Sequence, residues 1–141
     1  MSVSELLSPL VGRFVFGWFF LSQAMLYAGD WEGTIHLMSY RGIPGAAFIL
    51  AVAILFLVMG SLSLIFGYHA RYGALILFTI TIISMVTLHD YWLIPDAASR
   101  AAEHQLFACH AAIAGGLLML IGLGPGPFAV DNAGKGGPRK K

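Results

Sequence analysis

The sequence predicts an all-α integral membrane protein, an antiparallel bundle of four helices. The chain has 141 residues, of which 58% are apolar and only 11% are charged, whereas a soluble domain carries about 25% charged residues. Its mean hydropathy is +0.80. The 13% content of aromatic residues excludes a disordered chain. The apolar residues form long continuous runs, which are typical of segments that cross a bilayer.

Four runs are long enough to span the hydrocarbon layer, at residues 10–28, 46–68, 72–89 and 103–123. None alternates between polar and apolar residues, as the strands of a membrane barrel do. Backbone hydrogen bonds must close within the bilayer, so each run is expected to be a helix. The first run lacks a basic leader, and we expect it to remain as a helix rather than to be a cleaved signal peptide.

The boundaries of these helices follow from proline and glycine. Pro44 precedes the second run, Pro95 separates the third from the fourth, and Gly124-Pro125-Gly126-Pro127 follows the fourth. The second and third runs are joined by a turn so short that they are predicted to form an antiparallel hairpin. The chain is therefore expected to be one transmembrane domain over residues 1–127, followed by a flexible basic cytoplasmic tail over residues 128–141.

Small residues recur at every fourth position of the last run, at Ala108, Ala112 and Gly116. This spacing lets two helix backbones approach closely. We therefore expect the fourth helix to pack well inside the bundle.

The distribution of basic residues predicts the orientation in the membrane. An even number of spans places both termini on one side, and six of the eight Lys and Arg residues lie on that side. Cytoplasmic loops carry the excess of basic residues, so both termini are expected in the cytoplasm. The six are Arg13, Arg71, Lys135, Arg139, Lys140 and Lys141.

Polar side chains gather at the opposite, outward ends of the helices. His89 ends the third run, while Glu103 and His104 begin the fourth. His110 lies seven residues after Glu103, on the same helical face and about 10 Å deeper. We predict that these four residues line an outward-facing polar pocket that binds a quinone headgroup. A metal ion or a haem is an alternative ligand, and solvated or paired groups at helix ends are the structural alternative.

Other chemistry has little support in the sequence. Cys109 has no partner cysteine and is expected to pack in its helix. Arg13 is expected to extend to the headgroups, or to bind a lipid phosphate or a partner. No dinucleotide fingerprint, phosphate loop or hydrolase elbow is present. A net charge of +1 argues against binding to nucleic acid.

Several short motifs, taken in order, resemble the DoxX family. They are Gly12-Arg13 with Gly17 and Phe20-Leu21, Gly42-Ile43-Pro44, Gly60, Gly67, Arg71 to Leu75, His110 to Leu118, and Gly124-Pro125-Gly126 with Asp131. The resemblance covers about residues 10–132. Many members have a glutamate where this chain has Phe56-Leu57, and an asparagine where it has His110. The resemblance implies a four-helix protein of the bacterial inner membrane, in a family named after the small subunits of a quinone-linked oxidoreductase.

Two functions therefore remain open. The first is a small membrane subunit of a quinone-linked redox assembly, in which His89, Glu103, His104 and His110 serve the quinone, so that the chain would be part of an oxidoreductase. The second is a non-catalytic scaffold or accessory subunit of a larger membrane complex. Both functions imply protein partners as well as the lipid bilayer.

Overall fold

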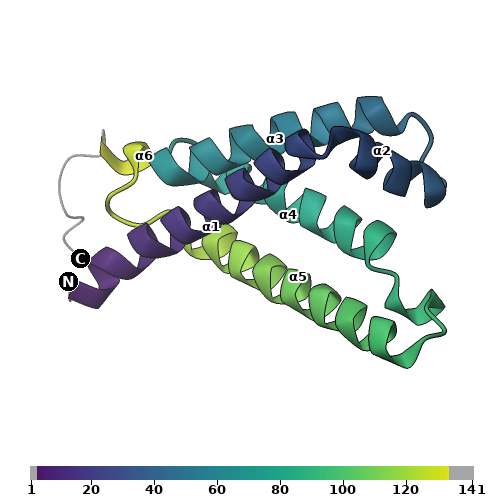
Figure 1. Cartoon of the computed structure of the whole chain (residues 1–141). Coiled ribbons are helices and arrows are strands. Elements are labelled where there is room, and N and C mark those ends of the chain that lie inside the picture. The colour runs from purple at the N-terminus through teal and green to yellow at the C-terminus, as the bar shows by residue number, and fades with distance from the viewer. Residues whose placement is uncertain (1–2, 134–141) are drawn as a thin grey trace.

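The structure, a computed structural model, describes residues 3–133. Four of its helices are long and apolar enough to cross a membrane, which confirms the predicted helical class and its four spans. The described residues contain no strand. The elements are α1 (Val3–Gly29), α2 (Trp31–Tyr40), α3 (Ala46–Phe66), α4 (Ala70–Leu88), a 3-10 turn η1 (Tyr91–Leu93), α5 (Ala97–Leu123) and α6 (Val130–Ala133). Figure 1 shows their order.

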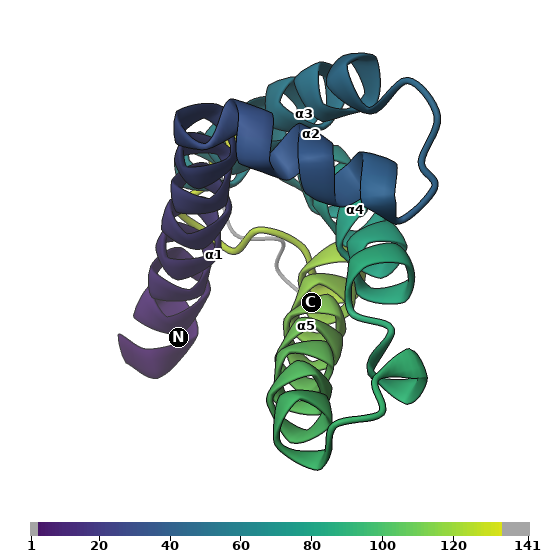
Figure 2. The same ribbon diagram turned by 45° about the vertical axis from the view of Figure 1, so that its right-hand side comes forward.

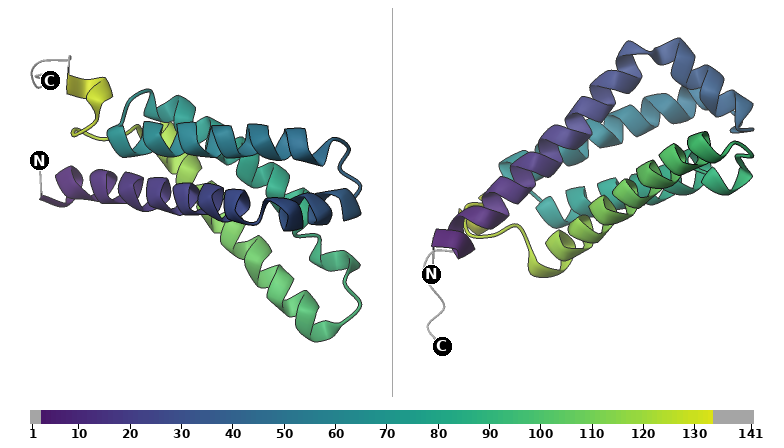
Figure 3. Two further views of the ribbon diagram at one scale, coloured as in Figure 1. Left: turned by 45° about the horizontal axis from the view of Figure 1, so that its top comes forward. Right: turned by 60° about the horizontal axis from the view of Figure 1, so that its bottom comes forward.

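Two ends of the molecule are distinguished below. The beginning of α1 and the short α6 lie at one end, which we call the terminal end. The end of α4, the beginning of α5 and all of α2 lie at the other, which we call the distal end (Figure 3). The distal end corresponds to the predicted outward side.

The helix α2 is an element that the sequence analysis missed, because it is too short to span a membrane. One face of α2 is packed against α3: Met38 is 7% exposed and packs with Ala46 and Leu50 of α3, and Ile35 lies against the same cluster. This face holds α2 across the distal end rather than along the other helices (Figure 2).

The helix α5 begins at Ala97, earlier than residue 103, where the sequence analysis placed its start. Asp96 is the N-cap, and its carboxylate accepts hydrogen bonds from the backbone N–H and the hydroxyl of Ser99, at 2.8 and 2.7 Å. These two bonds favour the charged carboxylate and hold the pKa of Asp96 below its usual value. An acidic N-cap of this kind satisfies backbone donors that the first helical turn leaves unpaired.

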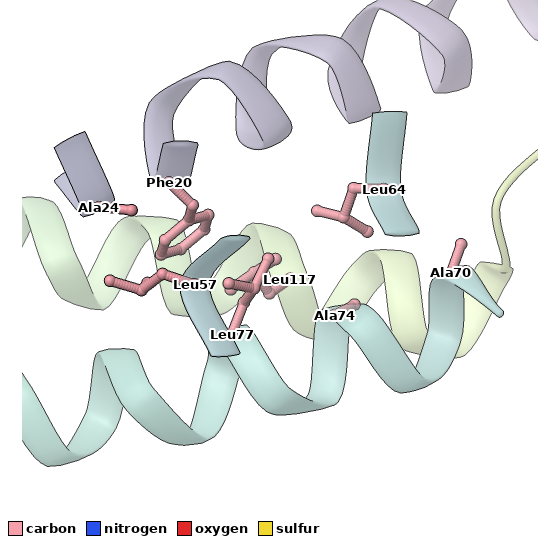
Figure 4. Close-up of a cluster of buried hydrophobic side chains, with 8 residues drawn as sticks. All are labelled: Phe20, Ala24, Leu57, Leu64, Ala70, Ala74, Leu77 and Leu117. Atoms are coloured by element: carbon pink, nitrogen blue, oxygen red, sulfur yellow. The ribbon is translucent and has the colours of Figure 1, made fainter. Parts of the chain in front are cut away.

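The main core lies where α1, α3, α4 and α5 approach one another (Figure 4). The side chain of Leu77 from α4 is fully buried, and it occupies the space beside Gly60 of α3, where a Cβ atom would lie 2.6 Å from its Cγ. This close approach requires glycine at residue 60. The buried cluster comprises Phe20, Ala24, Leu57, Leu64, Ala70, Ala74, Leu77 and Leu117.

The packing is sequential: α1 lies on α3, α3 on α4, and α4 on α5. Toward the distal end α1 and α5 diverge (Figures 1 and 2). The antiparallel four-helix bundle expected from the sequence is therefore not confirmed.

The expectation that α5 lies well inside the protein is wrong. Its most apolar window is 11% buried, the lowest share among the four spans. Ala114 and Leu117 face the core, whereas Ala108 and Ala112 are exposed. Only Gly116 of the small-residue series makes a close approach, to the ring of Phe16 in α1. Spacing by four places small residues on one face, but it does not determine which face meets a neighbour.

The segment after α5 folds back over the terminal end. Ala129 is 3% exposed, and α6 follows it, so residues 128–133 differ from the flexible tail that was predicted. Asp131 accepts hydrogen bonds from the backbone N–H groups of His69 and Ala70, at 2.7 and 3.0 Å, and thereby caps the start of α4. The predicted tail beyond residue 133, with its four basic residues, lies outside the described residues.

One alternative from the sequence analysis, in which the Arg13 side chain extends to the lipid headgroups, is wrong. The Arg13 side chain is 1% exposed, and Nη2 donates a hydrogen bond of 3.2 Å to the Phe128 carbonyl. Asp131 lies close enough for its charge to attract the guanidinium. The Nε and Nη1 atoms have no hydrogen-bond partner within the described part of the chain. Arg13 therefore ties α1 to the segment after α5.

Candidate functional site

Three of the four predicted site residues meet at the distal end, between the end of α4 and the first half of α5. His89 follows the last residue of α4, and its Nδ1 lies 3.0 Å from Oε2 of Glu103. The two side chains are 17% and 30% exposed. Of the structural alternative, solvated or paired groups at helix ends, this partial burial and the hydrogen bond exclude fully solvated groups and agree with a pair.

His110 is the deepest of the four residues along α5, and its ring lies against that of His89, with centroids 4.6 Å apart. It is half-buried between α5 and the end of α4. Its Nδ1 lies 2.8 Å from the Leu106 carbonyl oxygen. A carbonyl only accepts hydrogen bonds, so in this contact Nδ1 of His110 is the donor and Nε2 makes no hydrogen bond to Leu106.

His104 belongs to a neighbouring aromatic cluster instead. Its ring packs edge-on against Tyr91 of η1, with centroids 4.8 Å apart. Tyr91 also contacts Trp92 and Phe107 at 5.2 and 5.3 Å. The separation arises because residue 104 is turned by about 100° from residue 103 around the helix axis. The cluster covers the side of the His89 and Glu103 pair on which η1 lies.

An ion pair that the sequence analysis did not predict joins the distal loops. Arg41, which follows α2, pairs with Asp90, the residue after His89. Both side chains are largely buried, at 22% and 16% exposed. The two residues are far apart in sequence, and no spacing rule connects a loop after a short helix with the end of a span. Arg41 and Asp90 hold the His89 backbone to the α2–α3 loop.

Metal ligands were the alternative that the sequence left open for the distal histidines. Within residues 3–133, no three His, Cys, Asp or Glu side chains converge in a way that could hold a metal ion. The sequence analysis expected Cys109 to pack in its helix, and this expectation is wrong, because Cys109 is exposed on α5. Histidine, carboxylate and aromatic side chains are the groups that the distal site offers to a ligand.

An apolar groove of about 600 Å³ lies between α3 and α4, with Met38 and Thr34 of α2 at its distal mouth. None of the four predicted residues lines it, but Thr87 and Leu88, immediately before His89, do. The hydroxyls of Thr79 and Thr87 on its wall donate to carbonyls of their own helix, at 2.9 and 2.8 Å. The groove therefore offers a hydrocarbon surface whose lining extends along α4 as far as Leu88.

Comparison with known proteins agrees with the architecture. The family model described as DoxX matches residues 8–90, more than half of the chain. The chain belongs to the DoxX family. It is also 27% identical over 131 residues to the inner membrane protein YqjF of Escherichia coli strain K12, an alignment that covers 93% of this chain and 95% of that relative. No solved structure matches.

These matches and the four apolar helices identify a multi-pass inner membrane protein. Of the distal site, the DoxX match contains His89, Arg41 and Asp90 but ends before Glu103, His104 and His110.

Proposed function

We propose that this DoxX protein is the small membrane subunit of a quinone-linked redox assembly, with His89, Glu103 and His110 exchanging protons with the quinone headgroup. The observation that carries the proposal is the packing of two imidazole rings and one carboxylate at the distal ends of α4 and α5. His110 lies seven residues beyond Glu103, inside the predicted span, and an ionisable group at membrane depth usually marks a ligand or proton pathway.

The tautomers of His89 and His110 support proton exchange with a quinone headgroup. The Nδ1 atoms of both rings are directed to oxygen atoms, of Glu103 for His89 and of Leu106 for His110. In each neutral ring Nε2 is then a proton acceptor, and in each charged ring it is a donor. The Glu103 carboxylate accepts the hydrogen bond of His89 Nδ1 at 3.0 Å and thereby orients the ring.

A quinol that becomes a quinone releases two protons and two electrons. The Nε2 atoms of His89 and His110 receive the protons, and the electrons pass to a redox centre held by a partner subunit. In the reverse direction that partner supplies the electrons, and the two imidazolium groups supply the protons. His104 is turned toward Tyr91, and we assign it to the wall of the site rather than to proton transfer.

The apolar groove supports the same function, because a membrane quinone carries a long hydrocarbon tail. Ligand sites in proteins are mostly apolar, with few polar groups at one end. The groove between α3 and α4 has this composition, and its lining includes Thr87 and Leu88, the two residues before His89. The tail would lie in the groove, and the headgroup would lie at the histidine pair.

The test uses the protein purified in mild detergent with its bound partners. His110→Ala and Glu103→Gln are expected to lower the extractable quinone and the rate of quinol oxidation at least tenfold. His36→Ala is the matched control, since His36 is an exposed histidine on α2 at the same end. Equal quinone content and equal rates in all four proteins would contradict the proposal.

A second candidate function is that of a scaffold for a larger membrane complex. The exposure of α5 favours it, because Ala108 and Ala112 present a smooth surface that could receive another helix. On this alternative, Ala112→Leu reduces association with partner subunits, and His110→Ala leaves it intact. Quantifying the co-purified subunits in the two variants separates the scaffold from the redox subunit.

A further inference from the structure

A second cavity, of about 500 Å³, lies at the terminal end, where the start of α4 meets the segment that follows α5. It is separate from the distal site and from the groove. One wall consists of His69, Arg71 and Tyr72, and the other of residues 123–126 with Asp131 and Asn132.

The acidic group of this cavity is already engaged. The two carboxylate oxygens of Asp131 accept the backbone N–H groups of His69 and Ala70, and its charge faces the buried Arg13. The side-chain amide of Asn132 donates to the Gly126 carbonyl at 2.7 Å. The negative charge of Asp131 is therefore balanced by groups behind the cavity wall. It does not neutralise a positive side chain on the open side of the cavity.

Arg71 is the other charged side chain that lines this cavity. No residue of the described chain forms a hydrogen bond or an ion pair with its guanidinium, which lies over the backbone of Gly124. Gly124 has a φ of +90°, and a Cβ atom there would lie 3.1 Å from Nη2 of Arg71. Glycine at this position thus leaves the guanidinium room to lie along the cavity wall with its donors free.

The depth of the cavity matches the lipid headgroups. The spans α3, α4 and α5 end or begin at Phe66, Ala70 and Leu123, next to the cavity. Tyr68 and Tyr72 beside it are 60% and 69% exposed, as aromatic residues of a membrane interface are. Arginine recognises phosphate through two parallel hydrogen bonds.

We propose that this cavity binds a phosphate group, with Arg71 as its main contact and the Tyr72 hydroxyl and His69 ring as further donors. The ligand class is a phosphate ester or free phosphate, and the headgroup of an anionic lipid belongs to this class. The inference is independent of the proposed redox function, because none of its residues belongs to the distal site.

Binding is measured by calorimetry on the full chain in detergent, with dihexanoyl phosphatidylglycerol, dihexanoyl phosphatidylcholine and inorganic phosphate as probes. Arg71→Gln is expected to raise the Kd for phosphatidylglycerol about tenfold, the loss of one charge-assisted contact. Arg100→Gln, an exposed arginine on α5 at the distal end, is the matched control and is expected to change nothing. Tyr72→Phe, which removes one hydroxyl, is expected to raise the Kd less.

The probes identify the source of the phosphate. Binding of phosphatidylglycerol without inorganic phosphate indicates a lipid site, and binding of both with similar Kd indicates a site for free phosphate. Equal Kd for phosphatidylglycerol in the wild type, Arg71→Gln and Tyr72→Phe, or no binding of any probe to the wild type, overturns the proposal. Should Arg71→Gln not fold, Tyr72→Phe and His69→Ala provide the same comparison.

Discussion

Nδ1 of His89 lies 3.0 Å from Oε2 of Glu103, and this contact joins the end of one span to the beginning of the next. The pair closes the η1 loop between α4 and α5, and it orients the His89 ring toward His110. The contact thereby holds the η1 loop against α4 and α5 at the membrane surface.

A double-mutant cycle on His89→Ala and Glu103→Gln measures this contact. Because both side chains are partly exposed, we expect a coupling free energy of about 0.5–1 kcal/mol in thermal or denaturant unfolding. Glu103→Gln with Arg100→Ala is the control cycle and is expected to show no coupling. Additive effects of His89→Ala and Glu103→Gln would mean that their contact contributes nothing to stability.

Substitution of Gly116 tests the packing of α5 on α1. A Cβ atom at Gly116 would lie 2.5 Å from the ring of Phe16, whereas Gly115 has no atom within 4 Å. Gly116→Leu is therefore expected to destabilise the protein by about 1–3 kcal/mol. Gly115→Leu has the same change in helix propensity and is expected not to destabilise it. Equal melting temperatures for the two variants would show that α5 does not pack on Phe16.

Asp131→Ala tests the closure of the terminal end. The substitution removes the cap of α4 and leaves Arg13 buried without its opposing charge. We expect a loss of about 2–4 kcal/mol in unfolding free energy. Asp96→Ala removes an exposed cap from α5 and is the comparison, with a smaller expected loss of about 1 kcal/mol. A smaller loss for Asp131→Ala than for Asp96→Ala would contradict this account of Asp131.

The membrane orientation stays a prediction of the basic residues, with both termini in the cytoplasm. It is checked in a Cys109→Ala background, because Cys109 is exposed. A cysteine placed at residue 96 is expected to react with an impermeant reagent on intact cells, and one placed at residue 140 only after lysis. Labelling of residue 140 without labelling of residue 96 would reverse the topology.

The sequence by itself determined the class of the protein and the number of its spans. Hydrocarbon offers no hydrogen-bond partner to a backbone, so each long apolar run has to form a helix wherever its neighbours lie. The sequence also places His89 and Glu103 at the same end of the molecule, since the short connection between residues 89 and 103 keeps both at one membrane surface. Hydropathy does not report a short helix on that surface, and α2 was missed for that reason.

Only the tertiary structure decided which side chains meet. The Arg41–Asp90 pair and the capping of α4 by Asp131 join residues that are about 50 and 60 positions apart. Such contacts depend on the angle between helices, which the apolar runs leave undetermined because every face of a span is apolar. For the same reason the small residues of α5 could not reveal their own orientation, and Ala112 is exposed where Gly116 touches Phe16.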